Sequence, residues 1–255
     1  MKIDELYDKI IAAKYCTAFT GAGVSTLSGI RDFRGKDGLY NDLDAEKIFD
    51  IDYFKKDPSF YYKASADFIY NIDEKKPSIV HNVLAELEKM GLIKAIVTQN
   101  IDLLHERAGS VRVIEIHGSP KIHYCLRCTG INMSFEEAAL IIQSGDLPKC
   151  HKCNSVLKPA ITFFGESLPM DALKEAVEEA NKSDLMLVLG SSLTVYPAAS
   201  IPQYTLANGG EIIIVNNMNT PLHSRAALTY EDLGEVFEKI NEEVRIRNEE
   251  LGTRN

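Results

Sequence analysis

Residues 15–23, YCTAFTGAG, join a short apolar run to a turn of small residues. Such a run is typical of a parallel strand that is covered on both faces of its sheet. The backbone N–H groups of Gly21, Ala22 and Gly23 could approach a pyrophosphate, as in the first turn of dinucleotide-binding sheets. The match is incomplete, because Thr26 stands where the usual fingerprint has a third glycine. Alone, the turn is a weak indication of a nucleotide site.

Five further apolar runs end in glycine or polar residues, and helical patterns such as residues 78–91 and 170–183 lie between several of them. The runs span residues 92–98, 111–116, 159–164, 184–189 and 211–215. Strands that alternate with helices predict an α/β fold with a Rossmann-like, doubly wound parallel sheet. Ligands bind such sheets at the carboxyl ends of the strands. We therefore expect the polar residues that follow the runs to meet in one crevice.

Two stretches do not fit this sheet and predict an inserted small domain. Residues 40–75 are rich in aromatic residues with a helical pattern, and residues 119–158 contain two cysteine pairs. We expect these stretches to form the small domain, as a helical insertion and a zinc module. The remaining parts, 1–39, 76–118 and 159–255, would then form the large, Rossmann-like nucleotide-binding domain.

Four of the five cysteines form two C-x-x-C pairs, and 21 residues separate the pairs. Each pair can offer two thiolates to one tetrahedral zinc ion, and a complete thiolate shell leaves no position for a catalytic water. We expect a structural zinc bound by Cys125, Cys128, Cys150 and Cys153; disulfides or unrelated buried cysteines are the alternative. The neighbouring His123 and His151 are expected to be exposed loop residues, and Cys16 a core residue.

Composition narrows the possible partners and the compartment. The net charge of -9 argues against an electrostatic grip on nucleic acid and favours a basic partner. No apolar run approaches the roughly twenty residues of a membrane span, and the first residues lack a signal-peptide pattern. Cysteines paired for a metal suit a reducing compartment. We expect a cytoplasmic protein that binds neither membrane nor nucleic acid.

Candidate catalytic and binding residues follow the predicted strands. His117 ends one run and could act as a general base near neutral pH. Each motif has an ordinary structural explanation, such as a surface turn for residues 29–35, GIRDFRG. Their joint position at strand ends favours a common site. Its candidates are Asp32, Phe33 and Arg34 in that turn, Gln99, Asn100 and Asp102, Gly190-Ser191-Ser192, and Asn216.

Taken together, these motifs resemble those of the sirtuins, the NAD-dependent protein lysine deacylases. The shared segments are GAGVSTLSGIRDFRG, TQNIDLLHERAG, IEIHG, the paired C-x-x-C, FFGE, GSSLTVYP and IIIVN, in the order found in that family. The resemblance runs from residue 10 to residue 240 and is closest to the bacterial and archaeal branch. It implies that NAD and an acylated peptide meet between a Rossmann-like domain and a small domain.

The resemblance also implies roles for individual residues, with His117 and Asn100 as the catalytic residues. NAD would be bound by Gly21, Ala22, Gly23, Thr26, Phe33, Arg34, Gln99, Gly190, Ser191, Ser192 and Asn216, with Asp32, Asn100, Ile101 and Asp102 around the nicotinamide. Asn217, Asp232 and Leu233 would reach the adenosine end. The peptide would pair as a strand with Gly165-Glu166 and residues 194–196. Its acyl-lysine would contact Ile161, Thr162, Phe164 and Val195, with Phe33 beside them.

The implied reaction is transfer of the acyl group from lysine to ADP-ribose, with release of nicotinamide and O-acyl-ADP-ribose. His117 would deprotonate a ribose hydroxyl, and no metal is needed. Mono-ADP-ribosyl transfer is the alternative enzyme, and a non-catalytic NAD-sensing or zinc-ribbon module is the alternative of another class. The presence of His117 and Asn100 favours deacylation.

Some positions depart from the family pattern. Arg31 replaces the usual proline before DFRG, and Thr162 replaces a usual valine. Residues 36–60 lack the paired tyrosine and arginine with which some sirtuins recognise acidic acyl groups. We therefore expect acetyl and other neutral acyl groups as substrates.

Overall fold

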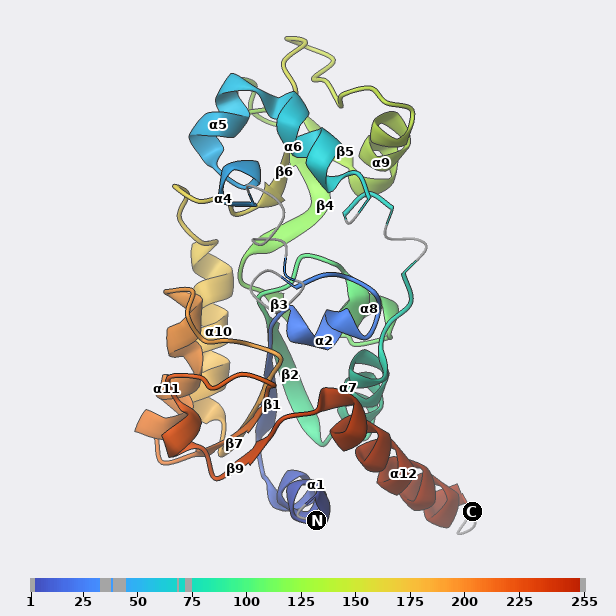
Figure 1. The fold of residues 1–255 in the computed structure, drawn as a ribbon, viewed down its shortest axis with the longest axis vertical. Coiled ribbons are helices and arrows are strands. Elements are labelled where there is room, and N and C mark those ends of the chain that lie inside the picture. The colour runs from blue at the N-terminus through green and yellow to red at the C-terminus, as the bar shows by residue number, and fades with distance from the viewer. Residues whose placement is uncertain (1–2, 33–37, 39–44, 68, 72–74, 253–255) are drawn as a thin grey trace.

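A six-stranded parallel sheet organises the larger part of the molecule, in the order β3-β2-β1-β7-β8-β9 (Figure 1). The computed structural model describes residues 3–32, 38, 45–67, 69–71 and 75–252. The strands are β1 (Cys16–Thr20), β2 (Ile93–Thr98), β3 (Val113–Glu115), β7 (Leu185–Leu189), β8 (Glu211–Val215) and β9 (Leu228–Tyr230). The predicted Rossmann-like α/β fold is confirmed.

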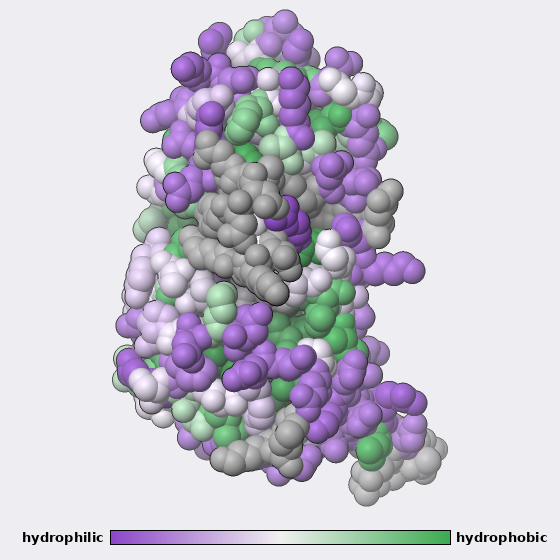
Figure 2. All heavy atoms as spheres, viewed as in Figure 1, coloured by the Kyte–Doolittle hydropathy of each residue, from purple (hydrophilic) through white to green (hydrophobic). Residues whose placement is uncertain are grey.

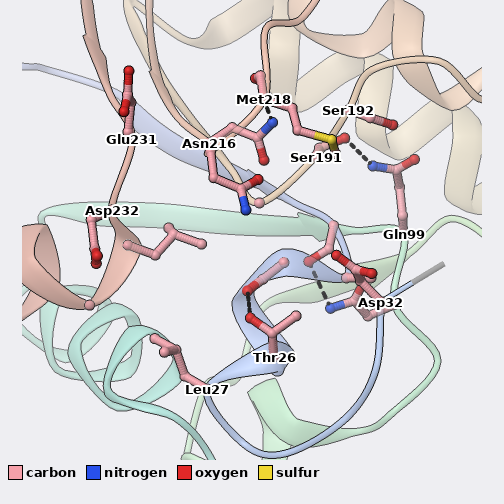
Figure 3. Close-up of a pocket in the computed structure, with 18 of the residues that line it drawn as sticks. Thr26, Leu27, Asp32, Gln99, Ser191, Ser192, Asn216, Met218, Glu231 and Asp232 are labelled. Carbon is pink, nitrogen blue, oxygen red and sulfur yellow. Dashed lines mark hydrogen bonds between the residues drawn. The ribbon is translucent and has the colours of Figure 1, made fainter. Parts of the chain in front are cut away.

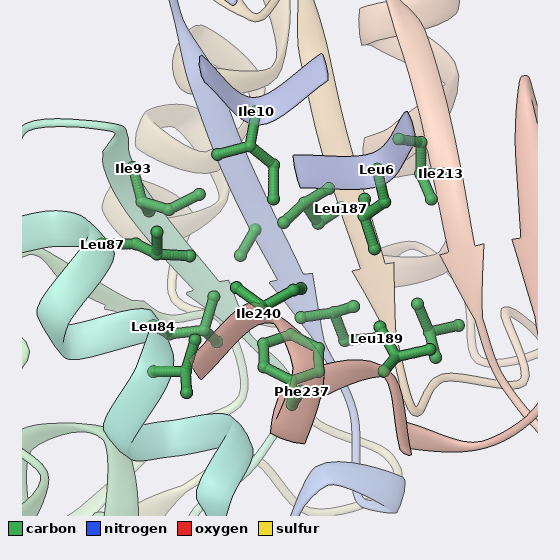
Figure 4. Close-up of a cluster of buried hydrophobic side chains, with 14 of the residues drawn as sticks. Leu6, Ile10, Leu84, Leu87, Ile93, Leu187, Leu189, Ile213, Phe237 and Ile240 are labelled. Atoms are coloured by element: carbon green, nitrogen blue, oxygen red, sulfur yellow. The ribbon is translucent and has the colours of Figure 1, made fainter. Parts of the chain in front are cut away.

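Helices cover both faces of this sheet because its strands are apolar on both sides. Leu185, Leu187 and Leu189 of β7 pack on one face, whereas Met186 and Val188 pack on the other. The first face is covered by α1 (Ile3–Ala12), α7 (Ile79–Lys89) and α12 (Leu233–Gly252), and Figure 4 shows part of this core. The second is covered by α10 (Met170–Lys182) and α11 (Ile201–Ala207). Each fully buried aliphatic side chain contributes about 1.5–3 kcal/mol of transfer free energy.

Helix α7 illustrates how local sequence fixes these elements. Its buried residues Val80, Val83, Leu84 and Leu87 recur at helical spacing and therefore share one face. Ser78 and His81 form a reciprocal capping box at its start. The chain leaves the helix through Gly91, whose positive φ of 71° suits a residue without a side chain.

A second, antiparallel sheet has the order β5-β4-β6, and its position corrects one prediction. It consists of β4 (Gly118–Tyr124), β5 (Asn132–Ser134) and β6 (Lys158–Ile161). The prediction that residues 159–164 form a strand of the parallel sheet was therefore wrong. The sixth parallel strand is instead β9, which is too short to stand out as an apolar run.

Short helices lie beside this small sheet (Figure 1). They pack with it around an aromatic core. They are α4 (Ala45–Ile48), α5 (Ile51–Lys56), α6 (Pro58–Ser65) and α9 (Phe135–Gln143). The helical pattern expected in residues 40–75 is confirmed for the part of the chain from Ala45 to Ser65. Helix α9 was not expected; a capping box of Ser134 and Glu137 begins it. The exact division of the chain into two domains stays a prediction.

Two of the three expectations for isolated His and Cys residues hold. Cys16 is fully buried in β1, and His151 is exposed. The expectation that His123 is an exposed loop residue was wrong, because it is buried in β4 with Nε2 2.7 Å from the hydroxyl of Tyr70. A histidine that alternates inward on a strand finds a polar partner from another element, which spacing to the cysteines could not reveal.

The outer surface is mixed. Hydrophilic side chains are spread over the face drawn in Figure 2, and hydrophobic ones show between them in small groups. Among the helices of the described residues, none is long and apolar enough to cross a membrane.

Candidate active site

The residues that directly follow four of the parallel strands continue the hydrogen bonding of the sheet. The N–H of Gly21 donates to Leu189, and that of Gln99 donates to Thr20, each over 3.0 Å. The N–H groups of Gly190 and Asn216 donate in the same way to the neighbouring strands. The strand ends therefore hold these residues in fixed positions along one crevice, as the sequence predicted.

The two glycine turns of the crevice lie directly against each other. The N–H of Gly23 donates to the carbonyl oxygen of Gly190 over 2.9 Å. A Cβ atom on Gly23 would lie 2.6 Å from the Cα of Gly190, and Gly190 itself has a positive φ of 59°. Only glycine fits both positions, and both glycines line the crevice.

A hydrogen-bonded cluster fixes the polar residues after β2. The Asn100 amide nitrogen donates to the carbonyl oxygen of Gly21 over 3.1 Å and to the Ser25 hydroxyl over 3.2 Å. Ser25 in turn donates to a carboxylate oxygen of Asp102 over 2.6 Å. Ser25 lies in the short helix α2 (Gly23–Thr26), and sequence reasoning missed it. Its position in the first helical turn after the glycines was the available signal.

The two ring nitrogens of His117 differ: Nδ1 is hydrogen-bonded within the protein, and Nε2 is the candidate proton acceptor. Its Nδ1 lies 2.8 Å from the carbonyl oxygen of Gln99. A carbonyl can only accept, so Nδ1 carries the proton in the neutral ring and Nε2 is the acceptor. Burial lowers the pKa of His117, although the bond to Gln99 opposes this. The arrangement favours a neutral imidazole that can receive a proton.

A first cavity, of about 310 Å³, lies over the glycine turns (Figure 3). Most of the predicted NAD-binding residues line it, and Leu27, Met218, Glu231 and Gly234 were missed. The predicted residues in its wall are Gly21, Ala22, Gly23, Thr26, Asp32, Gln99, Asn100, Gly190, Ser191, Ser192, Asn216, Asn217, Asp232 and Leu233. Phe33 and Arg34 lie outside the described residues. Its wall of glycine turns and amide side chains at the carboxyl ends of parallel strands suits a dinucleotide.

A second cavity, of about 590 Å³, adjoins the first. Most of the predicted peptide-binding residues line it, namely Ile161, Thr162, Phe164, Gly165, Glu166, Val195 and Tyr196, together with Ile101 and Asp102. Thr194 is not among its lining residues, and Phe33 lies outside the described residues. Sequence reasoning missed several apolar residues of its wall, including Phe49, Ile69 and Leu173, because they come from elements far apart in the chain. Ala22, Gln99, Asn100, His117 and Val195 border both cavities. His117 therefore stands where two ligands would meet.

The four cysteines of the C-x-x-C pairs form a compact cluster, with all sulfur atoms within 4.8 Å of one another. Tetrahedral zinc with four thiolates places its sulfurs about 3.8 Å apart, and the sulfurs of Cys125 and Cys153 are 3.6 Å apart. Backbone N–H groups of Arg127 and Cys128 point at the Cys125 sulfur, over 3.4 and 3.3 Å. The cluster could hold a structural zinc ion, and the cysteines lie outside the walls described for both cavities.

These features define a class of protein: an enzyme that brings a dinucleotide and a second substrate to one histidine, with a separate thiolate site for a metal. The family model described as the Sir2 family matches residues 21–197. The chain therefore belongs to the Sir2 family, the sirtuins.

Similar proteins are found in bacteria and archaea. The chain is 44% identical to the NAD-dependent protein deacetylase of Thermotoga maritima, over 95% of this chain and 98% of that protein. It is 43% identical to NAD-dependent protein deacylase 1 of Archaeoglobus fulgidus, with 95% and 98% covered. A Sir2 structure with a deacetylated p53 peptide and 3'-O-acetyl ADP ribose matches with a TM-score of 0.89, at 44% identity and 95% and 98% coverage. One with a p53 peptide and NAD⁺ has a TM-score of 0.88, at 43% identity and 96% and 100% coverage.

Proposed function

We propose that this chain is an NAD-dependent protein lysine deacylase, which transfers a neutral acyl group, such as acetyl, from lysine to ADP-ribose. The observation that carries this proposal is the position of His117 on the border of both cavities. The similar proteins that are named deacetylases and deacylases support it. So do the Sir2 structures with peptide and NAD⁺ or acetyl ADP ribose.

The first cavity would hold NAD, which supplies the ADP-ribose acceptor and nicotinamide as the leaving group. The glycine turns would offer the backbone N–H groups of Ala22 and Ser191 to the phosphates, because those of Gly21, Gly23 and Gly190 already donate to carbonyl oxygens of the fold. Asn216 would bind ribose hydroxyls. Asn100 and Asp102 would surround the nicotinamide, and Ser25 orients both side chains through its hydrogen bonds. This chain thus provides a rigid polar frame around the reacting end of the dinucleotide.

His117 would act as the general base. Its Nε2 is the acceptor nitrogen, because Nδ1 is bonded to the Gln99 carbonyl. The lowered pKa keeps this nitrogen unprotonated at neutral pH. The acyl oxygen would displace nicotinamide from the ribose, which gives an imidate. His117 would take a proton from a ribose hydroxyl as that hydroxyl attacks the imidate carbon, and water would then release lysine and O-acyl-ADP-ribose. General-base assistance is typically worth about 10² to 10⁴ in rate.

The second cavity would hold the acylated lysine of an extended peptide. Phe164 and Tyr196 are 43% and 62% exposed at its edge, as expected for residues that a peptide covers on binding. Ile161 and Val195 would line the apolar path of the lysine side chain, and the backbone of Gly165-Glu166 would pair with the peptide strand. We also place the protein in the cytoplasm, because its cysteine cluster suits a reducing compartment.

The test is a mass-spectrometric assay of the purified protein with an acetyl-lysine peptide, with and without NAD, beside the His117→Ala variant. We expect deacetylated peptide and O-acetyl-ADP-ribose, dependent on both NAD and His117. ADP-ribosylated peptide without loss of acetyl would instead establish mono-ADP-ribosyl transfer. NAD binding without any product from acetyl, butyryl or longer acyl peptides would support a sensing role.

A further inference from the structure

Lys158, the first residue of β6, is a fully buried lysine whose ammonium group contacts residues that line the second cavity. Its ammonium group has three N–H donors, and three acceptors surround it. These are the carbonyl oxygens of Pro159 at 3.2 Å and Ile161 at 2.7 Å, and a carboxylate oxygen of Glu166 at 2.8 Å. The ring of Phe163 lies 4.2 Å from the nitrogen and adds a cation–π contact.

The segment that surrounds this ammonium is also the wall of the second cavity. Residues 161–166 all line that cavity, and none of them is among the described residues that line the first. Glu166 makes a second contact that fixes residues 161–166, because its carboxylate accepts a hydrogen bond from the N–H of Phe163 over 2.9 Å. The N–H of Thr162 donates to the carbonyl oxygen of His117 over 2.7 Å. The Lys158–Glu166 pair therefore fixes residues 161–166 relative to His117, the proposed general base.

We propose that Lys158 is a positioning residue for the acyl-lysine substrate. Together with Glu166, it holds residues 159–166 around its ammonium group and so fixes the part of the cavity wall that the substrate contacts. The inference rests on the proposed deacylase function. It assigns to the ion pair of buried Lys158 and partly exposed Glu166 the task of fixing the backbone of residues 161–166, which line the second cavity. Lys158 does not line either cavity among the described residues, so the effect must pass through the segment.

The chemistry of the pair explains why another residue would not serve. A methionine of similar length would leave the Ile161 carbonyl without its donor and the Glu166 carboxylate without its buried counter-charge. Arginine would present a wide planar fork in a fully buried site shaped for a compact ammonium group. In both cases, we expect the segment to move until its polar groups find new partners.

The experiment compares the steady-state kinetics of the wild type, Lys158→Met, Glu166→Gln and the double variant, with an acetyl-lysine peptide and NAD varied in turn. We expect Lys158→Met to raise the KM for peptide roughly tenfold or more, with the KM for NAD unchanged, since a hydrogen bond to a charged group is lost near the peptide only. In the double variant, the rise in the peptide KM should be smaller than the two single rises combined, because the double variant leaves no unpaired buried charge.

Lys9→Met is the matched control, because it breaks an ion pair with Glu211 at the opposite end of the sheet. It should leave both KM values unchanged. Calorimetric titration of acetyl-lysine peptide measures binding without turnover, and thermal unfolding verifies that each variant is folded. If Lys158→Met does not fold, Glu166→Gln and the double variant decide the question.

An unchanged peptide KM and peptide affinity in folded Lys158 and Glu166 variants would overturn the positioning role while leaving the function intact. An equal rise in the KM for NAD would also overturn it, since that would show a general disturbance of the fold. A wild type that binds the peptide but forms no product would instead overturn the deacylase function.

Discussion

A single hydrogen bond decides which nitrogen of His117 can act. The bond from Nδ1 to the Gln99 carbonyl leaves Nε2 as the acceptor. The strand end that places His117 was readable from the sequence, but the partner of its ring was not. Ser25 was missed for the same reason, because its two hydrogen bonds join residues far apart in the chain.

The acid limb of the pH profile should report His117. Burial lowers its pKa below the usual 6.5, and the catalytic form is the deprotonated one. We therefore expect kcat/KM to stay level around neutral pH and to fall only as the pH drops through that lowered pKa. A pH series of initial rates, with protein unfolding followed in parallel, measures this. A limb centred above 6.5 would contradict the assignment.

The contact between the glycine turns predicts a large effect of one methyl group. Gly190→Ala places a Cβ atom 2.6 Å from the backbone nitrogen of Val24, at a positive φ of 59°. Gly91→Ala is the matched control, because its φ is 71° but nothing lies within 4 Å. We expect the control to cost about 1–2 kcal/mol of unfolding free energy, from backbone strain alone.

Gly190→Ala should cost more than this control and should also weaken NAD binding, because the turn must move. Chemical denaturation and NAD titration of both variants measure the two effects. Equal losses of stability, with equal NAD affinity, would show that the close approach is unimportant.

At the scale of elements, strand β4 connects two sites. It begins directly after His117 and ends directly before Cys125. Its partner β6 follows Leu157, which packs in a small cluster with Cys125 and Cys150. Strands β4 and β6 therefore connect the cysteine cluster to His117 and to residues 161–166, which line the second cavity.

Loss of the metal should consequently impair peptide use. We expect Cys150→Ser, or prolonged chelation, to remove zinc, to lower the thermal unfolding midpoint and to abolish most deacylation. Cys16→Ala is the control, since this buried thiol lies in the parallel sheet, apart from the cluster. It should retain one zinc per chain by atomic absorption. Full activity of a zinc-free protein would contradict the structural role.

The sequence predicted five of the six parallel strands and the helical insertion, but it misplaced β6. An apolar run of four to six residues fits a parallel or an antiparallel strand equally well, and only pairing decides between them. Pairing of Lys158 with Tyr124 places β6 in the small sheet. The three-residue β9 was missed because so short a segment has no usable periodicity.

For the whole molecule, the net charge of -9 should favour basic peptides. We expect kcat/KM for a lysine- and arginine-rich acetyl peptide to fall several-fold as salt rises, because screening weakens long-range attraction. An acetyl peptide of zero net charge is the control and should change little. Equal salt dependence for both peptides would show that the charge does not guide substrate choice.

The strand order also bears on how the chain is made. β1 lies between β2 and β7, and Cys16 pairs with Leu185. During synthesis, one edge of β1 must wait for a partner that emerges on the order of ten seconds later at the usual rate of elongation. Until then, an apolar strand with a free edge is open to pairing with other chains. Synthesis, between the emergence of β1 and that of β7, is therefore a stage at which this chain is vulnerable to aggregation.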